Sequence, residues 1–294
     1  MPSEPHFSQR ARAKVNLTLH VGRVIADIGE AYYGYHPLDS LVVFADIGDE
    51  INAEPAEKTQ LTIVGPFSKG LSAEADNLIL KAIAAVSARA SVPPFSVTLT
   101  KTLPVASGLG GGSANAAAML RILQSYADLP VSDWREIALS LGADVSVCLL
   151  SQTAHMTGIG EVVTPIKDLG QWPAVLVNPG VPTPTGAVFK AFDIMTGTNA
   201  PRETPRPQKL SGDMLARTLD GRNDLEPPAT ESVPIISEVL RELSVQTGAQ
   251  IARMSGSGAS CFALFDRTAQ AKHAAEILTK SHPEWWVQAA VFGD

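Results

Sequence analysis

The 294-residue chain contains little cysteine and no long apolar run, and both absences narrow its possible classes. Its two cysteines, Cys148 and Cys261, each stand alone in an apolar, strand-like stretch. Two isolated cysteines provide neither a disulfide framework nor the spacing of a metal site, so we interpret them as buried thiols in a reducing cytosol. No apolar stretch is long enough to span a bilayer, and residues 1–7 resemble neither a signal nor a transit peptide. We therefore expect a cytoplasmic protein that binds no membrane.

Positive charge is also scarce. The formal net charge of -7 argues against broad binding to nucleic acid or to anionic membranes. It still permits a phosphate-bearing ligand, because a few local donors are enough to bind one. A hydrophobic share of 45% with 18% charged residues is ordinary for a globular protein, and the length suits one large or two medium domains.

Hydrophobic periodicity predicts a mixture of helices and strands. Residues 11–21 alternate between apolar and polar, which predicts a strand with one buried face. Helical spacing predicts a helix over 77–90, capped by Asp76, and another over 113–127 that begins near Ser113. The remaining predicted strands are 41–47, 60–64, 95–100, 145–150, 154–157, 172–178, 251–254, 259–265 and 286–291, and the remaining helices are 133–141, 234–246 and 268–280. Residues 197–212 predict a loop, and the class is α+β with a domain boundary near residue 165.

The glycine-rich segment 104–114 is the most informative stretch of the chain. Its four glycines allow the backbone to approach a ligand closely and to adopt positive φ angles. A helix that begins at Ser113 would direct free N–H groups and the positive end of its dipole toward the segment. We therefore predict an anion site made by the backbone. Its residues are Pro104, Val105, Ala106, Ser107, Gly108, Leu109, Gly110, Gly111, Gly112, Ser113 and Ala114.

Three other interpretations of these glycines are weaker. A structural turn uses one or two glycines, whereas four surround this helix start. A dinucleotide fingerprint belongs in a first βαβ unit and is followed about 20 residues later by an acidic residue, but this segment comes after some hundred residues. A P-loop ends in Gly-Lys-Ser/Thr, and no lysine stands there.

Several segments together resemble one superfamily of kinases. Residues 104–113, Pro-x-x-x-Gly-Leu-Gly-Gly-Gly-Ser, resemble the ATP loop of the galactokinase, homoserine kinase, mevalonate kinase and phosphomevalonate kinase superfamily. Further matches follow in the expected order across about residues 11–265. They are 13–17 (Ala-Lys-Val-Asn-Leu), 34–36 (Gly-Tyr-His), 76–79 (Asp-Asn-Leu-Ile), 141–145 (Leu-Gly-Ala-Asp-Val), 223–226 (Asn-Asp-Leu-Glu) and 254–262 (Met-Ser-Gly-Ser-Gly-Ala-Ser-Cys-Phe).

The resemblance is closest to the branch that phosphorylates 4-diphosphocytidyl-2-C-methyl-D-erythritol in the non-mevalonate isoprenoid pathway. It implies an α+β, two-domain kinase fold, with domains over 1–165 and 166–294 and the active site in the cleft between them. It implies ATP and Mg²⁺ as cofactors and a small-molecule substrate, cytidine diphosphate methylerythritol. Another kinase of the superfamily, a decarboxylase of the same fold and a non-catalytic regulator are the alternatives.

The resemblance also implies roles for single residues. It makes Asp144 and Lys14 the acid/base pair and Asn16 a substrate contact. Taken alone, Asp144 suits a cap or ion pair where a predicted helix gives way to a strand, and Lys14 suits a solvated strand face. The resemblance implies that Ser113 binds Mg²⁺ or phosphate, with a helix N-cap as the alternative.

The implied base pocket combines two distant segments. Tyr35 and His36 match positions that stack on cytosine and hydrogen-bond it, while Thr185 and Phe189 match a substrate threonine and a second stacking ring. The alternative is a pair of core aromatics beside a surface histidine. The segment 256–258 resembles a third glycine motif of the superfamily but suits a plain hairpin equally well. The chain departs from the family pattern at residues 31–33, Ala-Tyr-Tyr, and at Ala114.

Overall fold

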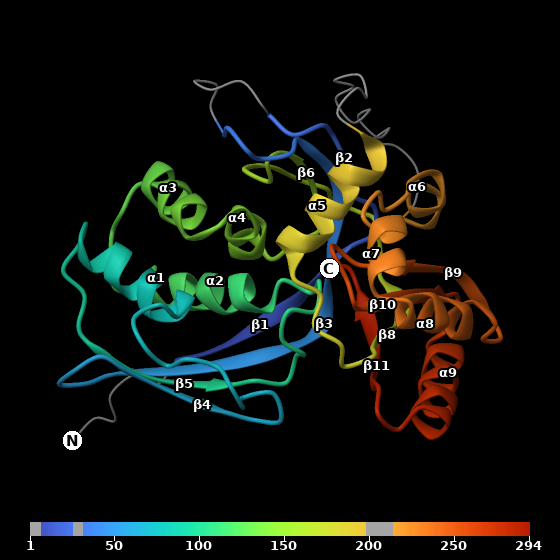
Figure 1. The fold of residues 1–294 in the computed structure, drawn as a ribbon. Coiled ribbons are helices and arrows are strands. Elements are labelled where there is room, and N and C mark those ends of the chain that lie inside the picture. The colour runs from blue at the N-terminus through green and yellow to red at the C-terminus, as the bar shows by residue number, and fades with distance from the viewer. Residues whose placement is uncertain (1–6, 26–31, 198–213) are drawn as a thin grey trace. The chain divides into compact units, whose positions relative to one another are not determined.

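The structure is a computed structural model that describes residues 7–25, 32–197 and 214–294. The chain folds into two compact units, and each unit is built from several separate segments of the sequence (Figure 1). The first contains residues 1–13, 47–105 and 110–151, and the second contains 14–46, 106–109 and 152–294. Nearly all of the predicted loop over 197–212 lies outside the described residues. No helix in the described ranges has the length and apolar character to cross a bilayer.

The first unit places helices beside a sheet (Figure 1). β5 (Phe95–Thr100) pairs antiparallel with the C-terminal part of β3 (Leu38–Pro55) and parallel with β4 (Gln60–Val64). In β5 every second side chain is buried, as its alternation predicts. β1 (Phe7–Asn16) also pairs with β3. The helices are α1 (Leu78–Ser87), α2 (Gly111–Leu123), α3 (Val131–Leu141) and α4 (Ala143–Leu150).

Alanine-rich α2 lies at the centre of this unit because small side chains permit close packing on several sides. It packs against both α1 and α4, and its residues 114–120 are all buried. Asn77 caps α1 by accepting a hydrogen bond from the Ile79 N–H at 3.0 Å. The prediction that Asp76 caps this helix is therefore wrong by one residue.

The second unit contains an antiparallel sheet in the order β11-β8-β10-β9. Its apolar core includes side chains of these strands and of α7, α8 and α9. The N-terminal part of β3 pairs with β2 and β6, and β6 pairs with β7. The strands are β2 (His20–Val21), β6 (Ala154–Gly158), β7 (Val162–Pro165), β8 (Trp172–Asn178), β9 (Ala249–Met254), β10 (Cys261–Phe265) and β11 (Trp286–Phe292). The helices are α5 (Thr185–Thr196), α6 (Met214–Asp220), α7 (Glu226–Ser232), α8 (Ile235–Ser244) and α9 (Thr268–Ser281).

Two predicted elements differ from the structure. The predicted strand over 145–150 is wrong, because these residues belong to helix α4. Val145 and Val147 favour a strand by propensity, but the segment buries both, with Cys148, where α4 packs on α2 and α3. The predicted strand over 11–21 is divided into β1 and β2, and from residue 13 onward both of its faces are buried. The single buried face is therefore also wrong.

Other predictions are confirmed. Both cysteines are buried and free, and burial raises the pKa of the Cys261 thiol well above its ordinary value. The mixture of helices and sheets confirms the α+β class. The boundary near residue 165 stays a prediction.

Candidate active site

The glycine-rich segment is divided between the two units: residues 104–105 and 110–114 belong to the first unit, and residues 106–109 belong to the second. In the first unit Gly110 is the N-cap of α2, with a φ of 63°, and no side chain caps the helix. The N–H of Ala114 bonds to the Gly110 carbonyl at 2.8 Å, whereas the N–H groups of residues 111–113 precede the first possible intrahelical acceptor. These donors and the positive end of the helix are the features that favour a bound anion, and the anion site itself stays a prediction.

Three details of that half correct the sequence interpretation. Ser113 is the third residue of α2, so its predicted place as N-cap is wrong. Among the four glycines, Gly108 and Gly110 have positive φ angles, whereas Gly111 and Gly112 lie in the helix and do not. An added Cβ at Gly112 would come no closer than 3.7 Å to a Leu78 carbon. Gly112 is therefore unnecessary for packing within its own unit.

Sequence reasoning missed a buried lysine beside this helix end. Lys101 is 4% exposed and forms an ion pair with buried Asp49. The other carboxylate oxygen of Asp49 accepts hydrogen bonds from the Thr102 and Leu103 N–H groups, each at 2.8 Å. An added Cβ at Gly111 would lie 2.9 Å from the Lys101 Nζ atom. An ammonium group thus lies at the first residue of α2, although the chain has no lysine within the glycine segment.

The other half of the segment, residues 106–109, packs against the turn at 255–258 in the second unit. Gly108 has a φ of 75°, and a Cβ there would lie 2.2 Å from the Ser255 carbonyl oxygen. The Ser255 hydroxyl donates to the Gly108 carbonyl at 3.0 Å and accepts from the Asn16 N–H at 3.1 Å. Gly108 is therefore required by the fold, since any side chain would collide with this turn.

Lys14 and Asn16 lie within the protein and not on a solvated face. They are 4% and 1% exposed, and the Lys14 N–H donates to the Leu109 carbonyl at 3.0 Å. The Asn16 amide nitrogen donates to the Ser40 hydroxyl at 2.7 Å. The Asn16 Oδ1 atom is buried and has no hydrogen-bond partner among the described residues. A buried acceptor without a partner is costly, and a donor group of a ligand would satisfy it.

Asp144 is the second residue of α4, so its predicted location between a helix and a strand is wrong. It lies in the first turn of α4 and is half-buried. The positive end of a helix stabilises a carboxylate in its first turn. The preceding helix α3 ends at Gly142, as predicted, although it begins two residues earlier, at Val131.

His36 and Phe189 come together in the second unit, while Tyr35 lies at the surface. The His36 and Phe189 rings are stacked with their centroids 4.9 Å apart. His36 is 9% exposed, and its Nδ1 donates to the Gly22 carbonyl at 2.9 Å. Tyr35 is 54% exposed and contacts Tyr32 edge to face. The alternative of a core Tyr35 beside a surface histidine is therefore wrong.

The threonine of the predicted base pocket lies beside the 255–258 turn. Thr185 is the first residue of α5, and its hydroxyl lies 2.9 Å from that of Ser257. Gly256 and Gly258 both have positive φ angles, and a Cβ at Gly256 would lie 3.0 Å from the Gly108 carbonyl oxygen and 3.3 Å from Asn16 Oδ1. In the second unit this turn thus contacts three predicted site residues: Asn16, Gly108 and Thr185.

Comparison with known proteins shows the family to which the chain belongs. The model of the GHMP kinases N terminal domain matches residues 77–152, and that of the GHMP kinases C terminal domain matches residues 208–284. The chain belongs to the GHMP kinase family, and kinases of this family use ATP.

Its similarity to particular members extends over nearly the whole chain. It is 46% identical to a protein of Cereibacter sphaeroides named 4-diphosphocytidyl-2-C-methyl-D-erythritol kinase, over 95% of this chain and 97% of the relative. A kinase of the same name from Dinoroseobacter shibae is 45% identical, with 96% and 93% covered. A crystal structure of 4-(cytidine 5'-diphospho)-2C-methyl-D-erythritol kinase superposes with a TM-score of 0.78 at 30% identity, covering 98% of this chain and all of the other.

Proposed function

We propose that this chain transfers the γ-phosphoryl group of ATP to the 2-hydroxyl of 4-diphosphocytidyl-2-C-methyl-D-erythritol, a step in isoprenoid precursor synthesis. The observation that carries the proposal is the uncapped N-terminus of α2, where Gly110 precedes N–H groups without an intrahelical acceptor and the buried Lys101 ammonium lies beside Gly111. Full-length relatives at about 45% identity that bear this kinase name support the choice of substrate.

The residues of this chain then divide the work of phosphoryl transfer, which consists mainly of positioning and charge stabilisation. The backbone of residues 110–113 binds the triphosphate, and Lys101 adds a positive charge near it. Asp144 accepts or orients the proton of the acceptor hydroxyl. Lys14 stabilises the negative charge that develops on the acceptor oxygen. Asn16 Oδ1, which is buried and without a partner among the described residues, accepts a hydrogen bond from the substrate.

A magnesium ion fits this site only as a companion of the triphosphate. Among the described residues no group of three His, Cys, Asp or Glu side chains is arranged to hold a metal ion. Mg²⁺ keeps several water ligands and is commonly held by substrate phosphates with one or two protein oxygens. In this chain the Ser113 hydroxyl in the first turn of α2 is the protein oxygen that would serve. The ion would neutralise charge on the phosphates.

The hydrogen bonding of His36 supports recognition of a cytosine. Because its Nδ1 donates to the Gly22 carbonyl, Nε2 is the ring nitrogen that is left to bond to a ligand. An acceptor at Nε2 suits the exocyclic amino group of cytosine and not the carbonyl oxygen that uracil has in its place. The Asp193 carboxylate lies 3.5 Å from Nε2. The base would therefore either displace this carboxylate or share Nε2 with it. Phe189 and exposed Tyr35 provide the stacking faces.

A substrate panel tests the proposal. The chain is incubated with ATP, Mg²⁺ and, separately, the cytidine diphosphate compound, its uridine analogue, mevalonate and homoserine, and ADP release is measured. We expect the cytidine compound to have the highest kcat/KM, with that of the uridine analogue lower by about 5- to 150-fold, because an unpaired polar edge is penalised by about 1–3 kcal/mol. ADP release that favours mevalonate or homoserine would overturn the choice of substrate, and a product lighter than the phosphate ester would indicate a decarboxylase.

A further inference from the structure

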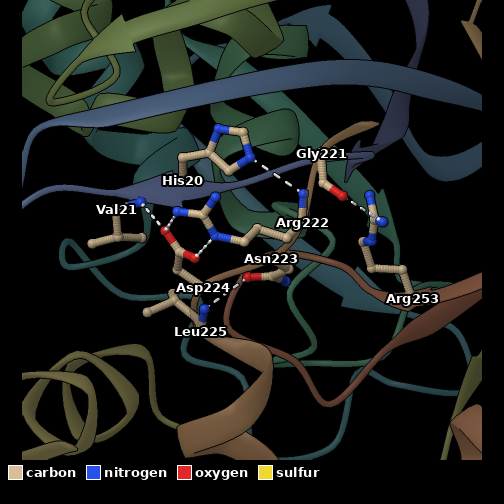
Figure 2. A network of polar contacts seen from close by, with 8 residues as sticks. All are labelled: His20, Val21, Gly221, Arg222, Asn223, Asp224, Leu225 and Arg253. Atoms are coloured by element: carbon tan, nitrogen blue, oxygen red, sulfur yellow. Dashed lines mark hydrogen bonds and ion pairs between the residues drawn. The ribbon is translucent and has the colours of Figure 1, made fainter. Parts of the chain in front are cut away.

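The motif Asn-Asp-Leu-Glu at 223–226 has no part in the proposed chemistry, yet it is heavily bonded. It lies between α6 and α7 in the second unit, and Figure 2 shows its surroundings. Asn223 is 5% exposed. Its amide nitrogen donates two hydrogen bonds, to the carbonyl oxygens of Met254 and Gly256, each at 2.8 Å. Its amide oxygen accepts from the Leu225 N–H at 3.0 Å. Every contact of the Asn223 side chain is therefore directed at backbone.

The two carbonyls that Asn223 holds are those on either side of Ser255. Glu226 adds a third constraint, since its Oε2 accepts from the Met254 N–H at 2.8 Å. Ser255 in turn bonds to the Asn16 N–H and to the Gly108 carbonyl. One asparagine thus fixes the backbone on both sides of the serine that joins the strand of Lys14 and Asn16 to the glycine-rich segment.

The rest of the motif holds a different segment. The Asp224 carboxylate accepts from the Val21 N–H at 2.9 Å and pairs with Arg222, whose own N–H donates to the His20 ring (Figure 2). None of these bonds reaches the 255–258 turn. Asp224 therefore offers a matched control for Asn223. Both residues belong to the same short motif and both side chains bond to backbone groups, but only Asn223 bonds to the turn.

We propose that Asn223 is a positioning residue, which holds the Ser255–Gly258 turn so that Asn16, Gly108 and Thr185 keep the geometry that phosphoryl transfer requires. The effect of Asn223 on turnover rests on the proposed function, whereas its effect on the structure of the turn does not. The N–H groups of the turn bond elsewhere: that of Ser255 donates to the Ser260 carbonyl, and that of Gly258 donates to the Ser255 carbonyl. Loss of the Asn223 amide would free both carbonyls that it holds.

Kinetics of three variants test the proposal. Asn223→Ala should lower kcat by about 10- to 100-fold, the usual effect of misplacing a site from a distance. The KM for ATP should stay within about threefold, because the N-terminus of α2 has its own contacts. Asp224→Ala should lower the melting temperature comparably but leave kcat within about twofold. If the two alanine variants lose stability equally and both keep kcat, Asn223 is structural only and the proposal fails.

The conservative variant Asn223→Asp adds a pH signature. The new carboxylate would face two carbonyl oxygens in a buried site, which raises its pKa. Below that pKa the protonated carboxyl donates one of the two lost hydrogen bonds, so the ratio of variant to wild-type kcat should rise as the pH falls. A ratio that does not change with pH, in a folded variant, would contradict the proposal.

Hydrogen exchange tests the same idea without any assay of activity. In Asn223→Ala, the peptide over 255–260 should exchange faster than in the wild type, whereas the peptide of α9 should not change. If the wild type does not phosphorylate the cytidine compound, the proposed function fails, and this measurement alone decides the positioning. Unchanged exchange over 255–260 would overturn the inference whatever the activity.

Discussion

Ser255 and Gly108, 147 residues apart in the sequence, are joined by a hydrogen bond from the serine hydroxyl to the glycine carbonyl at 3.0 Å. The same hydroxyl accepts from the Asn16 N–H. The beginning of the glycine-rich segment is thereby fixed to the strand that carries Lys14 and Asn16. The glycines of this segment consequently serve two purposes, which substitution by alanine can separate.

Gly108→Ala should destabilise the protein before any ligand is added. Its Cβ would lie 2.2 Å from the Ser255 carbonyl oxygen, and a φ of 75° costs about 1–2 kcal/mol for a residue with a side chain. We expect a clear fall in the free energy of unfolding, measured with denaturant in the absence of nucleotide. Unchanged stability would show that the turn at 255–258 does not constrain this residue.

Gly112→Ala should have the opposite signature. Its Cβ meets only a Leu78 carbon at 3.7 Å, and alanine in a helix is favoured over glycine by up to about 1 kcal/mol. Stability should therefore hold or rise, while ATP affinity, measured by calorimetry, falls about tenfold, or 1.4 kcal/mol, because the methyl group intrudes on the phosphate site. Gly111→Ala is less informative, since its Cβ would also press on Lys101. An unaltered ATP affinity in Gly112→Ala would remove this helix end from the nucleotide site.

Asp144→Asn should greatly lower turnover and leave ATP binding nearly unchanged. Loss of a positioned acid/base group lowers kcat by about 10²–10⁴-fold, and the dissociation constant of ATP should change little. Asp133→Asn is the matched control, because Asp133 also lies in the first turn of a helix, α3, but pairs with Arg89 at the surface. Near-normal kcat in a folded Asp144→Asn variant would refute the assignment.

His20 should make the free energy of unfolding depend on pH under acidic conditions. Burial, and next the charge of Arg222, lower the pKa of His20, while Asp224 and Asp39 oppose this and Arg253 adds to it. As the pH falls below about 6.5, an unfolded histidine gains a proton before the folded one does. The free energy of unfolding should therefore fall with the pH in that window.

His20→Gln checks this, because glutamine can still accept from the Arg222 N–H. The free energies of unfolding of the wild type and the variant are measured from pH 8 to pH 5. As the pH falls, that of the wild type should decrease more than that of the variant. A difference that stays constant would show that His20 does not titrate differently in the two states.

Sequence patterns correctly predicted the helices and strands in which burial follows the hydrophobic periodicity. They failed where tertiary packing determined the secondary structure. β5 and α9 follow their periodicity closely. The strand predicted over 145–150 is a helix because the packing of α4 overrides the propensity of Val145 and Val147. Alternation could not show that Lys14 and Asn16, on the polar face of β1, are buried, since their burial comes from residues distant in the sequence.

The candidate site shows the same division. The glycine pattern predicted a helix start with free N–H groups in this segment, because positive φ angles and free N–H groups are local properties, but it placed that start at Ser113 and not at Gly110. It could not predict that Lys101 approaches Gly111, or that His36 stacks on Phe189, because both contacts join separate segments. The resemblance to a kinase family named Tyr35, His36 and Phe189, but their different exposures come from the fold.

The central claim is most directly tested by a competition experiment with product analysis. The chain is given ATP, Mg²⁺ and an equimolar mixture of 4-diphosphocytidyl-2-C-methyl-D-erythritol, its uridine analogue, mevalonate and homoserine, and the products are identified by mass. We predict one phosphate ester for each ADP formed, mainly that of the cytidine compound esterified at the 2-hydroxyl, with a minor share from the uridine analogue and with mevalonate and homoserine recovered unchanged. Phosphorylation of another member of the mixture in preference, or ADP formed without any phosphate ester, would contradict the account.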